Sequence, residues 1–128
     1  MPIFLIDSEY FYYITEEKIS FDEFKKLDIR IGLILEAEVV PKSRSLVKLK
    51  VDIGESEPRQ IVAGISQYYK LEELIDRKIV VLANLQPRKL MGLESNGMLL
   101  AADVDHTPYL LKLPDGSEKD VPPGSKIS

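Results

Sequence analysis

The chain has 128 residues, of which 45% are hydrophobic and 30% are charged, so it is long enough for one folded domain and too short for two ordinary ones. It contains no cysteine, which excludes a disulfide framework, a thiolate metal site and a cysteine nucleophile, and favours a cytoplasmic location. The net charge of −4 argues mildly against a nucleic-acid partner, but residues 42–50 carry four basic side chains and no acid, so the charge is unevenly distributed.

Residues 1–19 form an aromatic arm, in which Phe4 and the aromatic run at 10–13 stand among acidic residues. We expect either an extra edge strand packed on the domain or an arm that crosses to a partner subunit. The apolar run at the start has no basic residue before it and soon meets Asp7 and Glu9, unlike a signal peptide. No other segment approaches the roughly 20 apolar residues of a membrane span, so we expect neither secretion nor membrane insertion.

The main domain is predicted to span residues 20–102 and to begin with a short helix. Ser20 and Glu23 have the Ser-x-x-Glu spacing of a capping box, in which each side chain bonds to the backbone of the other residue. Apolar side chains then recur at helical spacing and predict a face that lies against the sheet: Phe21, Phe24 and Leu27.

Two strands with a period of two follow the helix. In the first, the alternation places Ile29, Ile31, Leu33 and Leu35 on one face and Arg30, Gly32 and Ile34 on the other. In the second, at 47–53, apolar residues alternate with Lys48, Lys50 and Asp52. The second strand is therefore expected to be solvated on one side, and its two lysines share that side.

Three more strands are predicted, and a short helix or helical turn lies between the third and fourth strands. The strands are expected at residues 59–65, 78–85 and 97–102, and the helix at 68–75. Five strands with this helical insert are typical of the OB-fold, a small Greek-key barrel, so the fold class is all-β with short helices. Residues 103–128 contain one further predicted strand at 109–113 and several turn signals, and form an ordered C-terminal appendage.

The segment at residues 84–102 combines a basic loop with an apolar strand. Pro87 fixes its own backbone φ angle, and Gly92 permits a positive one. Arg88 and Lys89 lie between these two residues at the rim of the sheet. We expect Leu90 and Met91 to anchor this loop. Its charges could form an ordinary solvated turn or a binding site for a polyanion.

Four segments, in this order, resemble the tRNA-binding domain found in small dimeric tRNA-binding proteins, in the C-terminal region or separate beta chain of methionyl-tRNA synthetases, and in synthetase-associated cofactors of eukaryotes. The segments are residues 27–32, 48–54, 59–65 and 84–102. The resemblance implies an OB-fold that binds tRNA through its shaped body rather than through an anticodon sequence. In stand-alone members it also implies a homodimer closed by the segment beyond the barrel, here residues 103–128.

The resemblance also implies site residues. The motif Asn-Leu-x-Pro-Arg-Lys-Leu-Met-Gly falls on residues 84–92, and Glu-Ser-x-Gly-Met falls on 94–98. The first candidates for RNA contact are Arg88, Lys89, Ser95 and Met98, with Asn84 in the same motif, and the second candidates are Arg30, Lys48 and Lys50. We expect Ser95→Ala to weaken binding without altering the fold.

One segment departs from the family pattern. The family usually has His-Pro-Asn-Ala-Asp-Lys-Leu before the second strand, whereas residues 40–46 read Val-Pro-Lys-Ser-Arg-Ser-Leu. This more basic loop adds Lys42 and Arg44 as candidates for RNA contact. Any contact that depends on the usual histidine or asparagine cannot be carried over.

These features predict a structure-dependent tRNA-binding module, acting as the beta subunit of a methionyl-tRNA synthetase whose catalytic chain is separate. The alternative is an export-chaperone-like or peptide-binding homodimer, since a related group of small proteins has the same barrel. In that group the rim motif resembles Pro-Pro-Arg-Arg-Ile-Ala-Gly and lacks Glu-Ser-x-Gly-Met, so the motif here favours RNA.

We expect no catalysis, no metal and no cofactor in this chain. The sequence contains no glycine-rich phosphate loop and no recognisable nucleophile and base pair. His106 is the only histidine, and Asp103 and Asp105 flank it, so a metal site can be imagined. A single histidine among loop acids is more often a surface residue.

Overall fold

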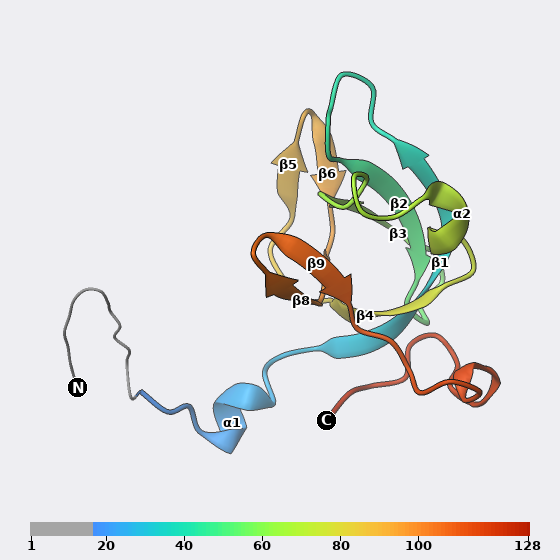
Figure 1. The fold of residues 1–128 in the computed structure, drawn as a ribbon. Helices are drawn as coiled ribbons and strands as arrows, with labels where there is room; N and C mark the ends of the chain where they lie inside the picture. The colour runs from blue at the N-terminus through green and yellow to red at the C-terminus, as the bar shows by residue number, and fades with distance from the viewer. Residues whose placement is uncertain (1–16) are drawn as a thin grey trace.

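The computed structural model describes residues 17–128. The aromatic residues of the predicted arm lie outside the described residues. Five antiparallel strands form one sheet in the order β3-β2-β1-β4-β7 and curl into a nearly closed barrel (Figure 1), so the prediction of an all-β, OB-like barrel with short helices is confirmed. Its strands are β1 (Ile29–Val39), β2 (Val47–Asp52), β3 (Arg59–Ala63), β4 (Lys78–Leu82) and β7 (Met98–Leu99).

Two hairpins and short helical segments surround this barrel. The hairpins are β5 (Arg88–Leu90) with β6 (Leu93–Ser95), and β8 (Ala101–Val104) with β9 (Thr107–Leu110); the helices are α1 (Phe21–Phe24), α2 (Leu71–Leu74) and the 3-10 turn η1 (Glu118–Asp120). The strand predicted at 97–102 is thus divided between the barrel and the second hairpin. The strand predicted at 109–113 begins earlier, at Thr107.

The barrel interior is filled by apolar side chains of the central strands. Val47, Leu49 and Val51 of β2 are fully buried, as the alternating pattern predicts. In β1 the face that lines the interior is the one with Gly32 and Ile34. A Cβ atom on Gly32 would lie 2.7 Å from a Val51 methyl carbon, so only glycine fits there without repacking.

The C-terminal segment pairs with the backbone of the first half of β1. The Ile31 backbone N–H donates to the carbonyl of Ser125 at 2.8 Å, and its carbonyl accepts from Gly124 N at 2.8 Å. Lys78 of β4 also donates to the carbonyls of Glu118 and Val121. The last residues of the predicted appendage therefore extend the sheet beside the first half of β1.

Helix α1 forms with the predicted capping box but does not pack on the sheet. The Ser20 hydroxyl accepts from Glu23 N at 3.1 Å, and the Glu23 carboxylate accepts from Ser20 N at 2.9 Å. The helix has no buried residue, and Phe21 is 70% exposed. Figure 1 shows it away from the barrel. The expectation that its apolar face lies against the sheet was wrong, because the helix lies before β1 and outside the barrel, where Phe21 and Leu27 remain exposed.

Helix α2 is the insert between β3 and β4. It lies over one end of the barrel, where Leu74 is fully buried and Asp76 N donates to the Ile34 carbonyl at 2.8 Å. Tyr69, just before it, accepts from Leu110 N and donates to the Pro108 carbonyl, both at 3.0 Å. The insert thereby attaches the β8–β9 hairpin to the barrel.

Candidate nucleic-acid interface

The basic motif forms the β5–β6 hairpin rather than a loop. Its two-residue turn consists of Met91 and Gly92, with φ of 49° and 80°. Positive φ at both positions is the type I′ geometry, whose twist matches that of paired strands. Met91 does not anchor the hairpin as expected, since it is 57% exposed at the turn. The hairpin nevertheless fixes the backbone of Arg88 and Lys89, the two residues before Leu90.

Hydrogen bonds to β3 hold the base of this hairpin. Ser95 is buried, and its hydroxyl accepts from Val62 N at 2.9 Å. The Gln60 amide donates to the Glu94 carbonyl at 2.9 Å, and Asn96 N donates to the Gln60 carbonyl at 2.8 Å. The Ser95 side chain thus replaces a backbone partner where β3 and β6 do not form a regular ladder. Its place indicates that it positions the hairpin, and direct RNA contact by Ser95 stays a prediction.

Arg88 and Lys89 are the cations that this hairpin presents. Both side chains are exposed, and neither forms an ion pair or hydrogen bond with any of residues 17–128. Glu94 lies opposite Lys89 in the strand register, yet no ion pair joins them. Both charges are therefore available to an external anion at low cost, since no internal partner has to be given up.

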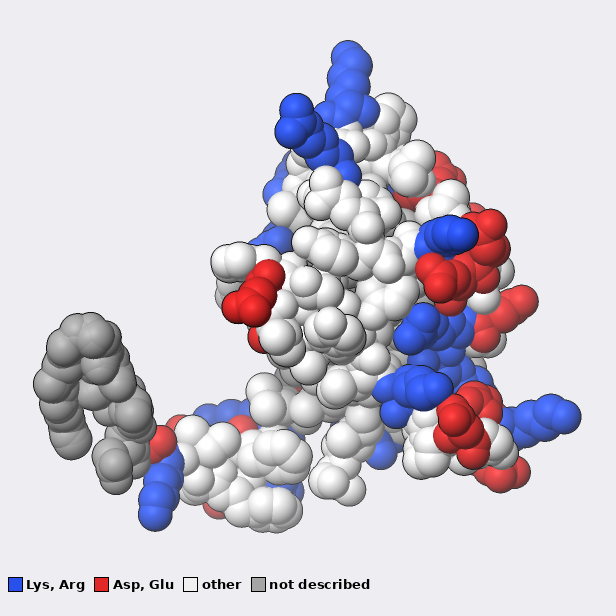
Figure 2. All heavy atoms as spheres, in the orientation of Figure 1, with Lys and Arg blue, Asp and Glu red and all other residues white. Residues whose placement is uncertain are grey.

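The loop between β1 and β2 supplies two more exposed cations. Lys42, with φ of 69°, and Arg44 form no ion pair with the described residues. This loop and the β5–β6 hairpin project from the same end of the barrel (Figure 1). In Figure 2, the Lys and Arg at that end have few acids beside them, whereas the Lys and Arg on the side of α2 and the C-terminal segment are interspersed with Asp and Glu. The positive charge is thus concentrated despite the net charge of −4.

Lys48 and Lys50 lie on the outer face of β2 but are matched with acids. In the register with β1, Lys48 is opposite Glu38 and Lys50 is opposite Glu36, and the Lys48 ammonium lies 3.6 Å from the Glu38 carboxylate. These acids reduce the positive potential of that face. Contact between these lysines and RNA remains a prediction, with weaker electrostatic support than for the hairpin.

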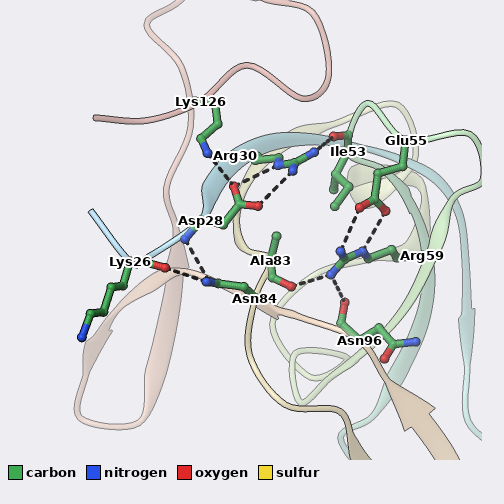
Figure 3. A network of polar contacts seen from close by, with 10 residues as sticks. All are labelled: Lys26, Asp28, Arg30, Ile53, Glu55, Arg59, Ala83, Asn84, Asn96 and Lys126. Carbon is green, nitrogen blue, oxygen red and sulfur yellow. Dashed lines mark hydrogen bonds and ion pairs between the residues drawn. The ribbon is translucent and has the colours of Figure 1, made fainter. Parts of the chain in front are cut away.

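Arg30 and Asn84 belong to a polar network that fastens the start of β1 (Figure 3). The Arg30 guanidinium makes two 2.9 Å bonds to the Asp28 carboxylate and one of 3.1 Å to the Ile53 carbonyl. Asn84 accepts from Asp28 N at 2.9 Å and donates to the Lys26 carbonyl at 2.6 Å. Both side chains are therefore engaged within the fold.

The charges of this network stabilise one another. The Arg30 hydrogen bonds lower the pKa of the Asp28 carboxyl below its ordinary value, and the same bonds raise the pKa of Arg30. Lys126 from the C-terminal segment adds an ion pair of 3.4 Å to Asp28. The network thus joins three parts of the chain, and its arginine is not a free cation.

Arg59 is a structural cation that the sequence reasoning did not single out. It makes two 2.9 Å bonds to Glu55 and also donates to the carbonyls of Ala83 and Asn96. Its hydrogen bonds lower the pKa of the Glu55 carboxyl. The i,i+4 spacing of Glu55 and Arg59 was the available signal, although it did not reveal the distant carbonyls.

Met98 lies beside the cationic hairpin. It is 45% exposed, and together with Arg88 and Ser95 it lines a small hollow next to β3. The structure thus brings three first-choice candidates into one place, with Lys89 on the same hairpin. Arg30 and Asn84 instead belong to the network of Figure 3.

Comparisons with known proteins identify the family of this chain. A family model described as "Putative tRNA binding domain" matches residues 29–126. The chain belongs to this tRNA-binding domain family. The match includes the last residues of the predicted appendage, which in the structure extend the barrel sheet.

Curated relatives of this tRNA-binding domain include methionine–tRNA ligases. The ligase of Methanosarcina acetivorans is 51% identical over 113 residues, covering 88% of this chain and 15% of the ligase. The ligase of Thermotoga maritima is 52% identical over 113 residues, covering 88% of this chain and 17% of the ligase. The chain therefore spans less than a fifth of the length of these relatives.

Solved structures with the same barrel carry two kinds of name. The "MetRS related protein" of Pyrococcus horikoshii has a TM-score of 0.78 and 38% identity, covering 88% of this chain and 99% of that one. The "CsaA chaperone protein" of Picrophilus torridus has a TM-score of 0.74 and 32% identity, covering 87% of this chain and all of that one (100%). The barrel alone therefore does not separate RNA binding from a chaperone-like role.

Neither a metal cluster nor a membrane-spanning helix is found among residues 17–128. No group of three or more His, Asp or Glu side chains there could hold a metal ion, and His106 is exposed. None of the described helices is long and apolar enough to cross a membrane.

Proposed function

We propose that this tRNA-binding domain binds folded tRNA at the end of the barrel that carries the β5–β6 hairpin. The observation that supports this most is the pair of unpartnered cations, Arg88 and Lys89, on a hairpin whose backbone is fixed by a type I′ turn and by bonds to β3. A rigid pair of cations binds phosphates without ordering a loop first, which reduces the entropic cost of binding.

The bound RNA is a folded surface rather than an extended strand. Single-strand binders of the OB class stack bases on aromatic side chains, and β1, β2 and β3 contain none. Phosphate and 2′-hydroxyl contacts are the alternative, and they depend on the shape of the RNA. Affinity should therefore tolerate changes of tRNA sequence.

The domain supplies affinity rather than chemistry, acting as the beta subunit of a methionyl-tRNA synthetase with a separate catalytic chain. The support is that the methionine–tRNA ligases above contain a homologous segment within one long chain. A domain that binds tRNA in trans raises the local concentration of tRNA near the catalytic chain.

The subunit acts as a homodimer. Around the β8–β9 hairpin, Val104, Tyr109 and Leu111 are 55%, 56% and 44% exposed, which is costly for an isolated monomer. Two subunits on one tRNA would increase the overall affinity through effective concentration. Light scattering of the purified protein tests this state, and a monomeric mass at micromolar concentration would contradict it.

A titration tests the central function. Purified, RNA-free protein is titrated into labelled total tRNA across a salt series, with a single-stranded RNA of matched length as competitor. We expect salt-sensitive binding that the single strand does not compete away. Absence of binding at low salt would remove the RNA function and leave the barrel unexplained.

A chaperone-like role is the second candidate. Its support is the likeness to the CsaA structure at 32% identity over the whole of that chain. The same purified protein should then capture an unfolded polypeptide such as casein and leave tRNA unbound. Capture of casein at the concentration that gives no tRNA binding would reverse the order of the two proposals.

A further inference from the structure

A groove runs along the seam where the barrel is not closed by a backbone ladder. β3 and β7 are the two edges of the five-stranded sheet, and hollows lie between them. One of them has a volume of about 460 Å³, within the range typical of ligand sites, about 300–1,000 Å³. We call it the seam groove; its lining includes Gly64, Met98, Leu99, Ala101, Asp103 and Pro108.

One backbone position in the seam groove is free to bind a ligand. On this edge of β3, the Gln60 carbonyl accepts from Asn96 N, and Val62 N donates to Ser95. Gly64 is the next residue on the same edge, and its N–H and carbonyl make no hydrogen bond with any of residues 17–128. A ligand in the groove can therefore find one donor and one acceptor side by side.

The side chains around Gly64 have four different chemistries. Met98 and Pro108 offer apolar surfaces, suited to the face of a flat ring. Arg88 lines the adjoining part of the seam and is the exposed cation described above. Asp103 and His106 lie in the lining of the 460 Å³ hollow; Asp103 can accept from an amino group but repels phosphate, and His106 adds an imidazole ring.

An unstacked nucleobase combines these requirements. It has an apolar face, a hydrogen-bonding edge and a phosphate next to it. An extended peptide fits less well, because strand addition needs a row of unpaired backbone groups, and β3 offers only Gly64 beyond the positions taken by Asn96 and Ser95. The Asp103 carboxylate would also repel a second phosphate in the groove.

We propose that the seam groove receives one unstacked base of the bound tRNA, while Arg88 contacts the phosphate beside that base. This inference rests on the proposed function. It adds a base-binding site to a surface that otherwise recognises shape and charge. Folded RNAs with an accessible unpaired base should therefore bind more tightly than regular duplexes of the same length.

The test fills the groove without changing charge. A Cβ atom on Gly64 would have Ser45 Oγ, at 3.9 Å, as its only neighbour within 4 Å, so this position accepts a Cβ atom without a clash, and urea unfolding checks that Gly64→Leu is folded. Gln67→Leu adds the same side chain at an exposed position that does not line the groove, and serves as the control. Met98→Ala, at an exposed side chain, is the second variant.

The readouts are tRNA affinity, its salt slope and protection of individual bases from dimethyl sulfate on a tRNA transcript. We expect Gly64→Leu and Met98→Ala to weaken binding by about 5-fold, the low end of the range for one base stacked on an aromatic side chain, because Met98 and Pro108 carry no aromatic ring; the salt slope should be unchanged. One base protected by the wild type should become reactive in the Gly64→Leu complex. Gln67→Leu should behave as the wild type.

Several results would overturn the proposal. One is wild-type affinity and protection in both groove variants, which would leave the shape-reading function intact without a base site. Another is loss of casein binding in Gly64→Leu with tRNA binding unchanged, which would make the groove a peptide site. Absence of tRNA binding by the wild type is distinguishable from both, and would remove the proposed function together with this inference.

Discussion

Replacing Ser95 with alanine tests whether this residue holds the hairpin in place. The Ser95 side chain is 4% exposed, and its hydroxyl is the partner of the Val62 N–H, in a residue that is 6% exposed. Removing the hydroxyl leaves that buried donor unsatisfied, which costs about 1–3 kcal/mol. Since a domain of this size is stable by about 5–15 kcal/mol, Ser95→Ala should remain folded with measurably lower stability.

The assay is urea unfolding, combined with hydrogen exchange at the Val62 amide. We expect a lower midpoint at an unchanged slope, since the surface exposed on unfolding stays the same. The Val62 amide should also exchange faster than in the wild type. Ser66→Ala is the matched control, because the Ser66 hydroxyl donates to the Arg44 carbonyl in an exposed bond of 3.2 Å, and its loss should cost less than about 0.5 kcal/mol.

This prediction revises the expectation that Ser95→Ala changes binding alone. If the hydroxyl contacted RNA and had no structural role, the variant would lose affinity at wild-type stability. A stability loss equal to that of Ser66→Ala, with Val62 exchange unchanged, would refute the reasoning from the buried hydrogen bond. Affinity for tRNA should fall modestly at a constant salt slope, because no charge is removed.

The remaining predictions concern the core and the polar network. Gly32→Ala should lower the free energy of unfolding by about 1–3 kcal/mol through overpacking against Val51, whereas Gly64→Ala, with open space at its Cβ, should be nearly neutral; equal urea midpoints would contradict the packing argument. The pKa of Asp28 is lowered in the fold, so its contribution to stability is present above its unfolded pKa and is lost as pH falls through the folded pKa. Acid titration of stability should therefore be shallower in Asp28→Asn than in the wild type, and an identical acid slope would show that the pair with Arg30 contributes nothing.

The sequence patterns predicted the barrel strands because these are governed by local alternation. β2 follows the pattern at every core position, with Val47, Leu49 and Val51 fully buried. In β1 the alternation is equally clear, yet it could not show which face lines the interior. Ile31 on the outer face is also buried, and its backbone bonds to Ser125, far along the chain. The periodicity of apolar residues carries no information about contacts with such distant segments of the chain.

The exposed cations of the candidate site could be predicted from the sequence, but its hydrogen bonds could not. Exposure of Arg88 and Lys89 follows from their position between a proline and a tight turn. The same segment, residues 84–102, contains Ser95 and Asn84, but their partners are 33 and 56 residues away in the sequence. The segment thus contains exposed cations as well as side chains that bond within the fold, and only the contacts in the structure separate the two sets.

The salt dependence of tRNA affinity is the most direct test of whether Arg88 and Lys89 bind tRNA phosphates. Binding is measured for the wild type, for Arg88→Ala with Lys89→Ala, and for a charge-matched control, Lys112→Ala with Lys119→Ala, in the C-terminal segment outside the hairpin. We expect the hairpin variant to bind more weakly, with a salt slope smaller in magnitude by about two units, because each phosphate contact contributes about 0.9 to that slope. The control should behave as the wild type. Equal slopes for the folded hairpin variant and the wild type would show that these cations do not contact tRNA phosphates.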